Sequence, residues 1–280
     1  MREIHVDKIK KAISELCIKS NYNISNDIVE GLLKSKEEES WPLAKSILDK
    51  IIKNSEIAKN EQMPICQDTG MTCVFMEIGQ EVHIVGGNLE EYINEGVKKG
   101  YEEGYLRKSV VKDPINRVNT NDNTPAIIHY KIVDGDKIKI IVAPKGFGSE
   151  NMSQIKMLKP SDGIDGVKNF ILKVVNEAGP NPCPPMIVGV GIGGTFEKAA
   201  YLSKKALLRS IDSKNEDKFY SDLEEEILEE INKLGIGPQG FGGKTTALGI
   251  NIEKYPTHIA GLPVAVNISC HVTRHKEIIL

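Results

Sequence analysis

Apolar residues recur at helical spacing through the first 60 residues of the chain. Val6, Ile9 and Leu16 would share one face of a first helix, and comparable stripes follow Asn26 and Pro42. We therefore expect three helices, near residues 6–16, 26–33 and 42–52, which form a helical layer over residues 1–60.

Beyond residue 60 the chain alternates between strand-like and helix-like runs. Short apolar runs predict strands at residues 73–77, 81–86, 126–133, 138–143, 186–192, 246–253 and 264–269. Helical spacing predicts helices at residues 88–107, 164–178, 196–208 and 217–234. Asp134-Gly135-Asp136 lies between two of the strands and is typical of a hairpin turn. We interpret the whole as a mixed α/β fold of the α+β class, a single domain over residues 1–280 whose helical layer packs on a mixed sheet domain.

Composition and charge narrow the possible functions. The formal net charge of −3 offers no basic field of the kind that nucleic-acid binding needs. No apolar run approaches the roughly 20 residues of a membrane helix. The charged N-terminal residues also lack an apolar signal region. We therefore expect a protein of the reducing cytoplasm, with neither nucleic acid nor membrane as a partner.

The cysteines are the first candidates for chemistry, and the chain has five: Cys17, Cys66, Cys73, Cys183 and Cys270. Their odd number and wide spacing argue against a disulfide framework, and the lack of a Cys-X-X-Cys pair argues against a zinc ribbon. Cys17 in a helical stripe and Cys73 at the start of a strand are expected to be small buried residues. The other three each border a loop rich in proline, glycine or small polar residues, where backbone N–H groups can stabilise a thiolate. Three thiolates would leave one iron of a four-iron cluster open as a Lewis acid.

Six ordered blocks give the chain a resemblance to a known family. The blocks are Ile65–Gly70, Lys145–Asn151, Cys183–Pro185, Gly193–Thr195, Gln239–Lys244 and the segment around Cys270. Over nearly its whole length the chain resembles the alpha subunit, or N-terminal domain, of class I iron–sulfur fumarases and tartrate dehydratases. In that family the cysteines that match Cys66, Cys183 and Cys270 hold the cluster. The resemblance therefore implies a 4Fe-4S cofactor on loops of the sheet domain.

The resemblance also implies an acid group for the reaction. It places Gln67 and Asp68 against the substrate, although Asp68 followed by Thr69 and Gly70 is, read alone, typical of a turn. It pairs Asp68 with His258, which read alone would be a surface histidine or one whose hydrogen bonds are satisfied. Such a pair can pass a proton to a departing hydroxyl group.

Two further residues gain a role in substrate binding from the resemblance. Arg107 matches an arginine that binds a substrate carboxylate, a task that suits the planar guanidinium. Read alone, Arg107 would end the helix predicted from residue 88 and interact with its dipole. Gly148 matches a glycine whose backbone approaches the substrate.

Two glycine motifs offer rival interpretations. Gly189–Gly194 fits the GxGxxG pattern after a strand and before a helix, as a dinucleotide site requires, but close packing of strand and helix explains it as well. Gly243-Lys244-Thr245 resembles the end of a P-loop, yet Pro238 stands where the first glycine belongs and no helix follows. Two alternative functions lie outside the hydro-lyase class: an NAD-dependent oxidoreductase and a non-enzymatic cluster sensor.

The reaction that the resemblance implies is the reversible hydration of fumarate to (S)-malate, with dehydration of L(+)-tartrate as the alternative. Either reaction needs a base for a carbon-bound proton and cations on both carboxylates. No such base is recognisable in the chain, and the family keeps its base, with further Arg and Lys residues, on a second domain or beta subunit. We therefore expect a C4 dicarboxylate substrate, a beta partner and an α2β2 heterotetramer that contains an alpha–alpha dimer.

Overall fold

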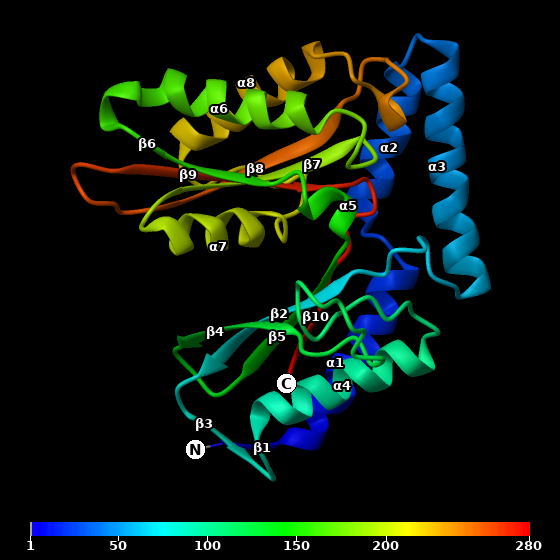
Figure 1. Cartoon of the computed structure of the whole chain (residues 1–280), viewed down its shortest axis with the longest axis vertical. Coiled ribbons are helices and arrows are strands. Elements are labelled where there is room, and N and C mark those ends of the chain that lie inside the picture. The colour runs from blue at the N-terminus through cyan, green and yellow to red at the C-terminus, as the bar shows by residue number, and fades with distance from the viewer. Residues whose placement is uncertain (1) are drawn as a thin grey trace. The chain divides into compact units, whose positions relative to one another are not determined.

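The computed structural model describes residues 2–280 and shows a mixed α+β fold, as the sequence predicts. The chain divides into two compact units, each built from segments that are separated in the sequence (Figure 1). Unit 1 comprises the residues up to Ser25, Asn54–Phe147 and Arg274–Leu280, and unit 2 comprises Asn26–Lys53 and Gly148–Thr273. The prediction of one domain over residues 1–280 stays a prediction.

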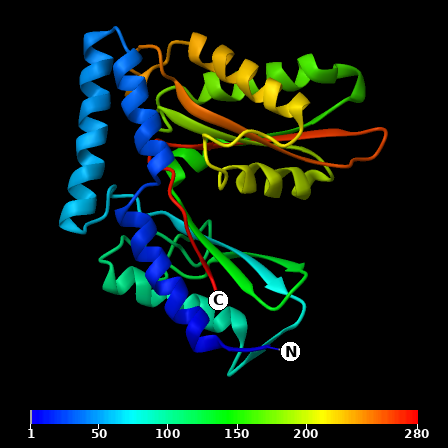
Figure 2. The same ribbon diagram turned by 180° about the vertical axis from the view of Figure 1, so that it is seen from behind.

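The sheet of unit 1 has the strand order β10-β5-β2-β4. Its strands are β2 (Met71–Gly79), β4 (Ile127–Val133), β5 (Ile138–Lys145) and β10 (Lys276–Ile279). β2 pairs in parallel with β4 and antiparallel with β5. β10, at the C-terminal end of the chain, runs antiparallel to β5 along the edge of the sheet (Figure 2). Five consecutive residues of β2 are buried, as expected of an apolar strand inside a sheet.

The predicted hairpin of β4 and β5 is wrong. The chain does turn at Asp134-Gly135-Asp136, but β2 lies between the two strands and pairs with both. Gly79, at the end of β2, packs against this turn so closely that a Cβ there would lie 2.3 Å from the carbonyl oxygen of Gly135. Turn residues show only that the chain reverses, whereas strand pairing is decided by which apolar strands bury one another.

Two helices cover the sheet of unit 1, and a pair of short parallel strands lies at its end. These elements are α1 (Val6–Tyr22), α4 (Leu89–Glu103), β1 (Arg2–His5) and β3 (Val82–Val85). The helices pack closely because glycines face the contact. A Cβ on Gly96 would lie 2.7 Å from the carbonyl oxygen of Lys10, and a Cβ on Gly100 would lie 2.8 Å from that of Ser14. Apolar residues of both helices form one buried core with β2 and β5.

The sheet of unit 2 has the strand order β6-β9-β7-β8. Its strands are β6 (Gln154–Leu158), β7 (Met186–Gly193), β8 (Ala247–Tyr255) and β9 (Leu262–Ser269), and its helices are α6 (Gly163–Ala178), α7 (Phe196–Ala206) and α8 (Lys218–Lys233). β7 is parallel to β8 and antiparallel to β9, which is antiparallel to β6. Every residue of β7 is buried, because α6 and α8 lie over one face of the sheet and α7 lies over the other (Figure 1).

Glycines inside β7 allow α7 to approach the strand. A Cβ on Gly189 would lie 2.1 Å from the carbonyl oxygen of Ser203, and a Cβ on Gly191 would lie 2.1 Å from that of Ala199. A separation this short is incompatible with any side chain, so only glycine fits. Packing of strand against helix therefore explains the first two glycines of the GxGxxG pattern.

The three N-terminal helices are confirmed, and they are divided between the units. α1 belongs to unit 1, whereas α2 (Asn26–Glu38) and the first part of α3 (Pro42–Glu61) belong to unit 2. The short helix α5 (Phe147–Glu150) lies within the block Lys145–Asn151. Within residues 2–280, every helix falls short of the length or the hydropathy that crossing a bilayer requires.

Candidate active site

Asp68 lies in the loop between α3 and β2. Each of its three oxygen atoms, two in the carboxylate and one in the backbone carbonyl, accepts a hydrogen bond. Oδ1 accepts the N–H of Gly70 at 3.0 Å, and Oδ2 accepts the N–H of Phe147 at 2.9 Å. The carbonyl oxygen accepts Nη2 of Arg274 at 2.5 Å. The Gly70 contact is the local turn that the residues alone predict. The side chain is half-exposed, so its remaining lone pairs can still bind a further donor.

Two buried polar side chains donate hydrogen bonds to the backbone of this loop. The hydroxyl of Tyr101 lies 2.8 Å from the carbonyl oxygen of Thr69 and 2.9 Å from that of Gly70, and Nδ2 of Asn123 donates to the same Gly70 oxygen at 3.2 Å. Burial raises the pKa of the Tyr101 hydroxyl, which keeps it protonated as a donor. Tyr101 and Asn123 are fully buried, so water does not compete for these hydrogen bonds to the loop.

Arg107 does not end a helix, contrary to the sequence-based interpretation. α4 ends at Glu103, and Gly104 caps it, so Arg107 lies in the loop that follows. Its side chain is exposed, and its carbonyl oxygen accepts the hydroxyl of Thr69 at 3.0 Å. The dipole interpretation is therefore wrong, while the backbone contact ties Arg107 to the Asp68 loop within unit 1.

Cys66 and Gln67 precede Asp68 in the same loop. Sγ of Cys66 lies 3.4 Å from Oε1 of Gln67. The Cys66 side chain is half-exposed and that of Gln67 is exposed. Both side chains can therefore reach a bound molecule.

In unit 2, Cys183 occupies the loop between α6 and β7 in an unusual conformation. Its φ of 55° is positive, which is uncommon for a residue with a side chain, and its N–H donates to the carbonyl oxygen of Pro180 at 3.1 Å. Nδ1 of His271 lies 2.8 Å from the Cys183 carbonyl oxygen, a contact that requires the proton on Nδ1. Gln239 donates to the Pro184 carbonyl oxygen from both its backbone and its side chain, at 2.8 and 3.0 Å.

Cys270 follows the end of β9, and the structure brings its segment to that of Cys183. The backbone N–H of His271, the next residue, also points to the Cys183 carbonyl oxygen, at 3.4 Å. Cys270 itself is half-exposed, and its carbonyl oxygen accepts the hydroxyl of Thr273 at 3.1 Å. Two of the three predicted ligand loops are therefore neighbours within unit 2.

His258 lies in the turn between β8 and β9 and caps that turn. Its Nδ1 accepts the N–H of Ala260 at 3.2 Å, and its carbonyl oxygen accepts the N–H of Gly261 at 2.9 Å. The side chain is exposed, as the residues alone predict. His258 belongs to unit 2 and Asp68 to unit 1, and their pairing stays a prediction.

Gly148, in α5, has room for a side chain. A Cβ there would meet only the carbonyl oxygen of Asn181, at an ordinary 3.8 Å. Packing within unit 2 therefore does not require glycine at this position. A requirement for glycine would have to come from something that approaches the backbone.

The five cysteines fall into two groups that fit the ligand prediction. Cys17 and Cys73 are buried, and burial raises the pKa of the Cys17 thiol to about 12, so this thiol stays neutral. Cys66, Cys183 and Cys270 are half-exposed or exposed and lie outside helices and strands, which suits thiolate ligands. Within residues 2–280, no group of three or more His, Cys, Asp or Glu side chains is gathered as a metal site. The donor set fits an iron–sulfur cluster, and its assembly stays a prediction.

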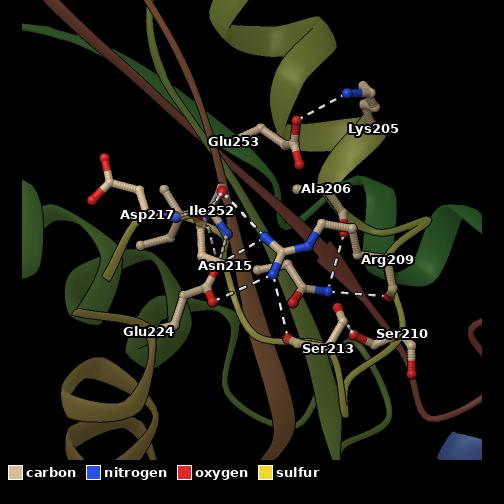
Figure 3. Close-up of polar contacts among 11 residues, drawn as sticks. Lys205, Ala206, Arg209, Ser210, Ser213, Asn215, Asp217, Glu224, Ile252 and Glu253 are labelled. Atoms are coloured by element: carbon tan, nitrogen blue, oxygen red, sulfur yellow. Dashed lines mark hydrogen bonds and ion pairs between the residues drawn. The ribbon is translucent and has the colours of Figure 1, made fainter. Parts of the chain in front are cut away.

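A charged pocket in unit 2 is lined by cations that are already paired, so it offers no free cation to a substrate carboxylate. Figure 3 shows the contacts of two of them, Lys205 and Arg209. Each of its four cations is paired: Arg209 with Glu224 at 2.9 Å, Lys205 with Glu253 at 2.9 Å, Lys214 with Glu225 at 2.7 Å, and Lys254 with Asp217. The guanidinium of Arg209 also donates to the carbonyl oxygens of Ser213 and Ile252. These contacts fasten the loop after α7 to β8 and α8, so we interpret the pocket as structural.

Three residues around Asp68 were missed by the sequence analysis: Tyr101, Asn123 and Arg274. Tyr101 lies in a predicted helix, where an aromatic residue reads as core. Asn123 lies in a segment without a periodic pattern. Arg274 follows Cys270 by four residues, and this closeness to a predicted ligand was the only available signal.

Comparison with known proteins gives matches over nearly the whole chain. A family model described as fumarate hydratase (Fumerase) matches residues 10–279. A Methanocaldococcus jannaschii protein, provisionally named L(+)-tartrate dehydratase subunit alpha, is 44% identical over 273 residues, which cover 95% of each chain. The L(+)-tartrate dehydratase subunit alpha of Escherichia coli O157:H7 is 31% identical, over 98% of this chain and 91% of its own length. The subunit of the same name from E. coli strain UTI89 is 32% identical, over 96% of this chain and 89% of its own length. Every residue predicted for the site lies within residues 10–279, the range that the family model matches.

Proposed function

The chain belongs to the fumarate hydratase family and is a hydro-lyase, and on this premise we propose that it is the alpha subunit of an L(+)-tartrate dehydratase. One observation carries the choice of substrate: relatives of 31–44% identity over 95% or more of the chain bear that name. The name of the family model supports fumarate as the second candidate. The names of the relatives thus favour L(+)-tartrate, the alternative substrate, over fumarate, which the sequence led us to expect first.

Dehydration of L(+)-tartrate breaks one C–O bond and one C–H bond. The hydroxyl group leaves one carbon with a proton from an acid, and a base takes the proton from the neighbouring carbon. The products are water and the enol of oxaloacetate. Negative charge accumulates on the carboxylate next to the carbon that loses its proton, so cations at the two carboxylates accelerate the reaction.

We propose that Cys66, Cys183 and Cys270 hold a cluster of the 4Fe-4S type. The donor set supports this assignment, because these three cysteines are the accessible ones in the described chain. When bound, such a cluster supplies an iron without a protein ligand that acts as a Lewis acid on a hydroxyl or carboxylate oxygen. Thiolates of this kind persist in a reducing compartment, and we propose the cytoplasm as the site of action.

The chain's own polar residues would bind the substrate and move the proton. We propose that Asp68, with His258, delivers a proton to the departing hydroxyl group, since the fixed position of Asp68 suits a proton donor. The exposed guanidinium of Arg107 would bind one carboxylate. Gln67 and the backbone of Gly148 would contact the rest of the substrate.

A partner subunit would complete the site. The relatives are named as alpha subunits, which implies at least one other subunit in those enzymes. A substrate with two negative charges needs both ends neutralised, and Arg107 alone cannot serve both. We propose that a beta subunit supplies the carbon base and further cations in an α2β2 assembly with an alpha–alpha dimer.

Anaerobic expression with and without a candidate beta subunit tests the proposal. The complex should contain about four irons and four sulfides per alpha chain, and its kcat/KM should be higher for L(+)-tartrate than for (S)-malate or fumarate. The alpha chain alone should bind iron but turn over none of these acids. A higher kcat/KM for fumarate would replace tartrate with the second candidate. Activity on none of the three acids by an iron-loaded complex would refute the proposed function.

A further inference from the structure

Arg274 is buried in unit 1 with most of its hydrogen-bonding capacity unused. Only 5% of its surface is exposed, and Nη2 donates to the carbonyl oxygen of Asp68 at 2.5 Å. Nε and Nη1 are buried and have no hydrogen-bond partner. A guanidinium has five N–H donors, so one hydrogen bond leaves most of them unsatisfied.

Such a side chain costs stability. A guanidinium is always charged, and removing it from water without partners for its N–H groups is unfavourable. An apolar residue of similar length would fill the same volume without this cost. Stability alone therefore does not explain arginine at position 274, and an explanation must come from what the guanidinium contacts.

The guanidinium of Arg274 and the carboxylate of Asp68 both lie close to Gly146. A Cβ built on Gly146 would lie 3.1 Å from Oδ2 of Asp68 and 4.0 Å from Nη2 of Arg274. Gly146 thus leaves a narrow space that the two charged groups border. Oδ2 accepts the N–H of Phe147, the residue after Gly146, so the carboxylate is held on the same side as this space.

We propose that Arg274 is a positioning residue for Asp68. Its guanidinium fixes the backbone of Asp68, and the fixed backbone places the carboxylate where Gly70 and Phe147 donate to its two oxygens. The inference rests on the proposed function only for the catalytic role of Asp68. The positioning role does not require Arg274 to contact the substrate, since Nε and Nη1 of its guanidinium are buried.

Hydrogen exchange of the full chain without its partner tests the geometry directly. Arg274→Met should accelerate amide exchange about tenfold in the peptides that contain Gly70 and Phe147, because the loss of a charged donor frees the Asp68 backbone. Arg209→Met is the matched control, since it removes another largely buried arginine, in unit 2. The control should accelerate exchange around residues 213–217 and 250–254 and leave the two Asp68-bonded amides unchanged.

Arg274→Lys keeps the positive charge but lacks the planar guanidinium group. This variant provides the test if Arg274→Met does not fold. It should also accelerate exchange at Gly70 and Phe147, by less than the Met variant. Unchanged exchange at these two amides in a folded Arg274 variant would overturn the proposal. An equal acceleration in the Arg209 control would overturn it too.

Kinetics of the iron-loaded complex with a beta subunit separate positioning from binding. Misplacement of Asp68 should lower kcat of the Arg274→Met enzyme about 100-fold, with KM little changed. The Arg209→Met enzyme should keep its kcat. A raised KM with normal kcat and normal exchange would make Arg274 a substrate ligand and refute the proposal. If the wild-type complex dehydrates no acid, the proposed function fails, while the exchange measurement still decides whether Arg274 fixes the loop.

Discussion

Gly191→Ala should destabilise the protein strongly, although it adds only one methyl group. The new Cβ would lie 2.1 Å from the carbonyl oxygen of Ala199, 2.6 Å from the backbone nitrogen of Ser203 and 2.8 Å from Cβ of Leu202. Two of these atoms are backbone of α7, so the helix must move away from β7. Overpacking of this kind costs about 3 kcal/mol. The lower entropy of the unfolded Ala chain offsets less than about 1 kcal/mol of this.

Thermal and urea unfolding of the full chain measure the effect. A loss of about 3 kcal/mol should lower Tm by roughly 6–12 °C in a unit of this size. Gly148→Ala is the matched control, because its Cβ would meet only the Asn181 carbonyl oxygen at 3.8 Å. The free energy of unfolding of the control should stay within about 0.5 kcal/mol of wild type.

The same pair of variants distinguishes packing from binding. Gly148→Ala should lower the activity of the complex despite its normal stability, since a methyl group there would stand between backbone and substrate. A Tm for Gly191→Ala equal to that of wild type would refute the packing explanation for this glycine. The dinucleotide interpretation of Gly189–Gly194 would then regain its support.

Three further predictions concern thiols and protons. Each of the predicted ligands Cys66, Cys183 and Cys270, when replaced by Ser, should cost the protein its cluster, measured as iron and sulfide content. Full iron and sulfide content in all three variants would contradict the assignment. Asp68→Asn and His258→Asn should keep the iron but slow turnover roughly 100-fold, and wild-type rates would remove their catalytic role. Burial raises the pKa of the Cys17 thiol from 9.0 to about 12, so the folded state holds this proton more tightly and stability should fall as pH rises through this range. The free energy of unfolding of Cys17→Ala, measured with urea at several pH values, should fall less steeply as pH rises. A pH dependence equal to that of wild type would contradict this prediction.

The elements were largely predictable from the sequence because their apolar residues repeat at a fixed period. The strand pairing was not, since β2 is separated from β4 and β5 by a helix and a long loop. β4 and β5 have clear patterns and a suitable turn, yet both satisfy their backbones on β2. Periodicity describes one segment at a time, whereas pairing depends on competition among all the strands.

The candidate site divides in the same way. The residues of Ile65–Gly70 and the three accessible cysteines stand out in the sequence as motifs. Arg274, Tyr101 and Asn123 do not, because their roles depend on contacts over 31 to 206 residues with a backbone carbonyl oxygen, which no side-chain pattern records. Arg107 was misplaced for a smaller reason: Gly104 ends α4 one turn before the predicted boundary.

The chain passes from one compact unit to the other four times, at residues 25–26, 53–54, 147–148 and 273–274. A single genetic crossover within the chain would therefore leave at least one unit with segments from two parents. Exchange of a whole unit between relatives would require several simultaneous junctions. Variation should therefore accumulate by point substitution, and the chain should pass between genomes as one undivided piece. Synthesis on the ribosome faces the same constraint, since unit 1 acquires its edge strand β10 only after all of unit 2 has been made.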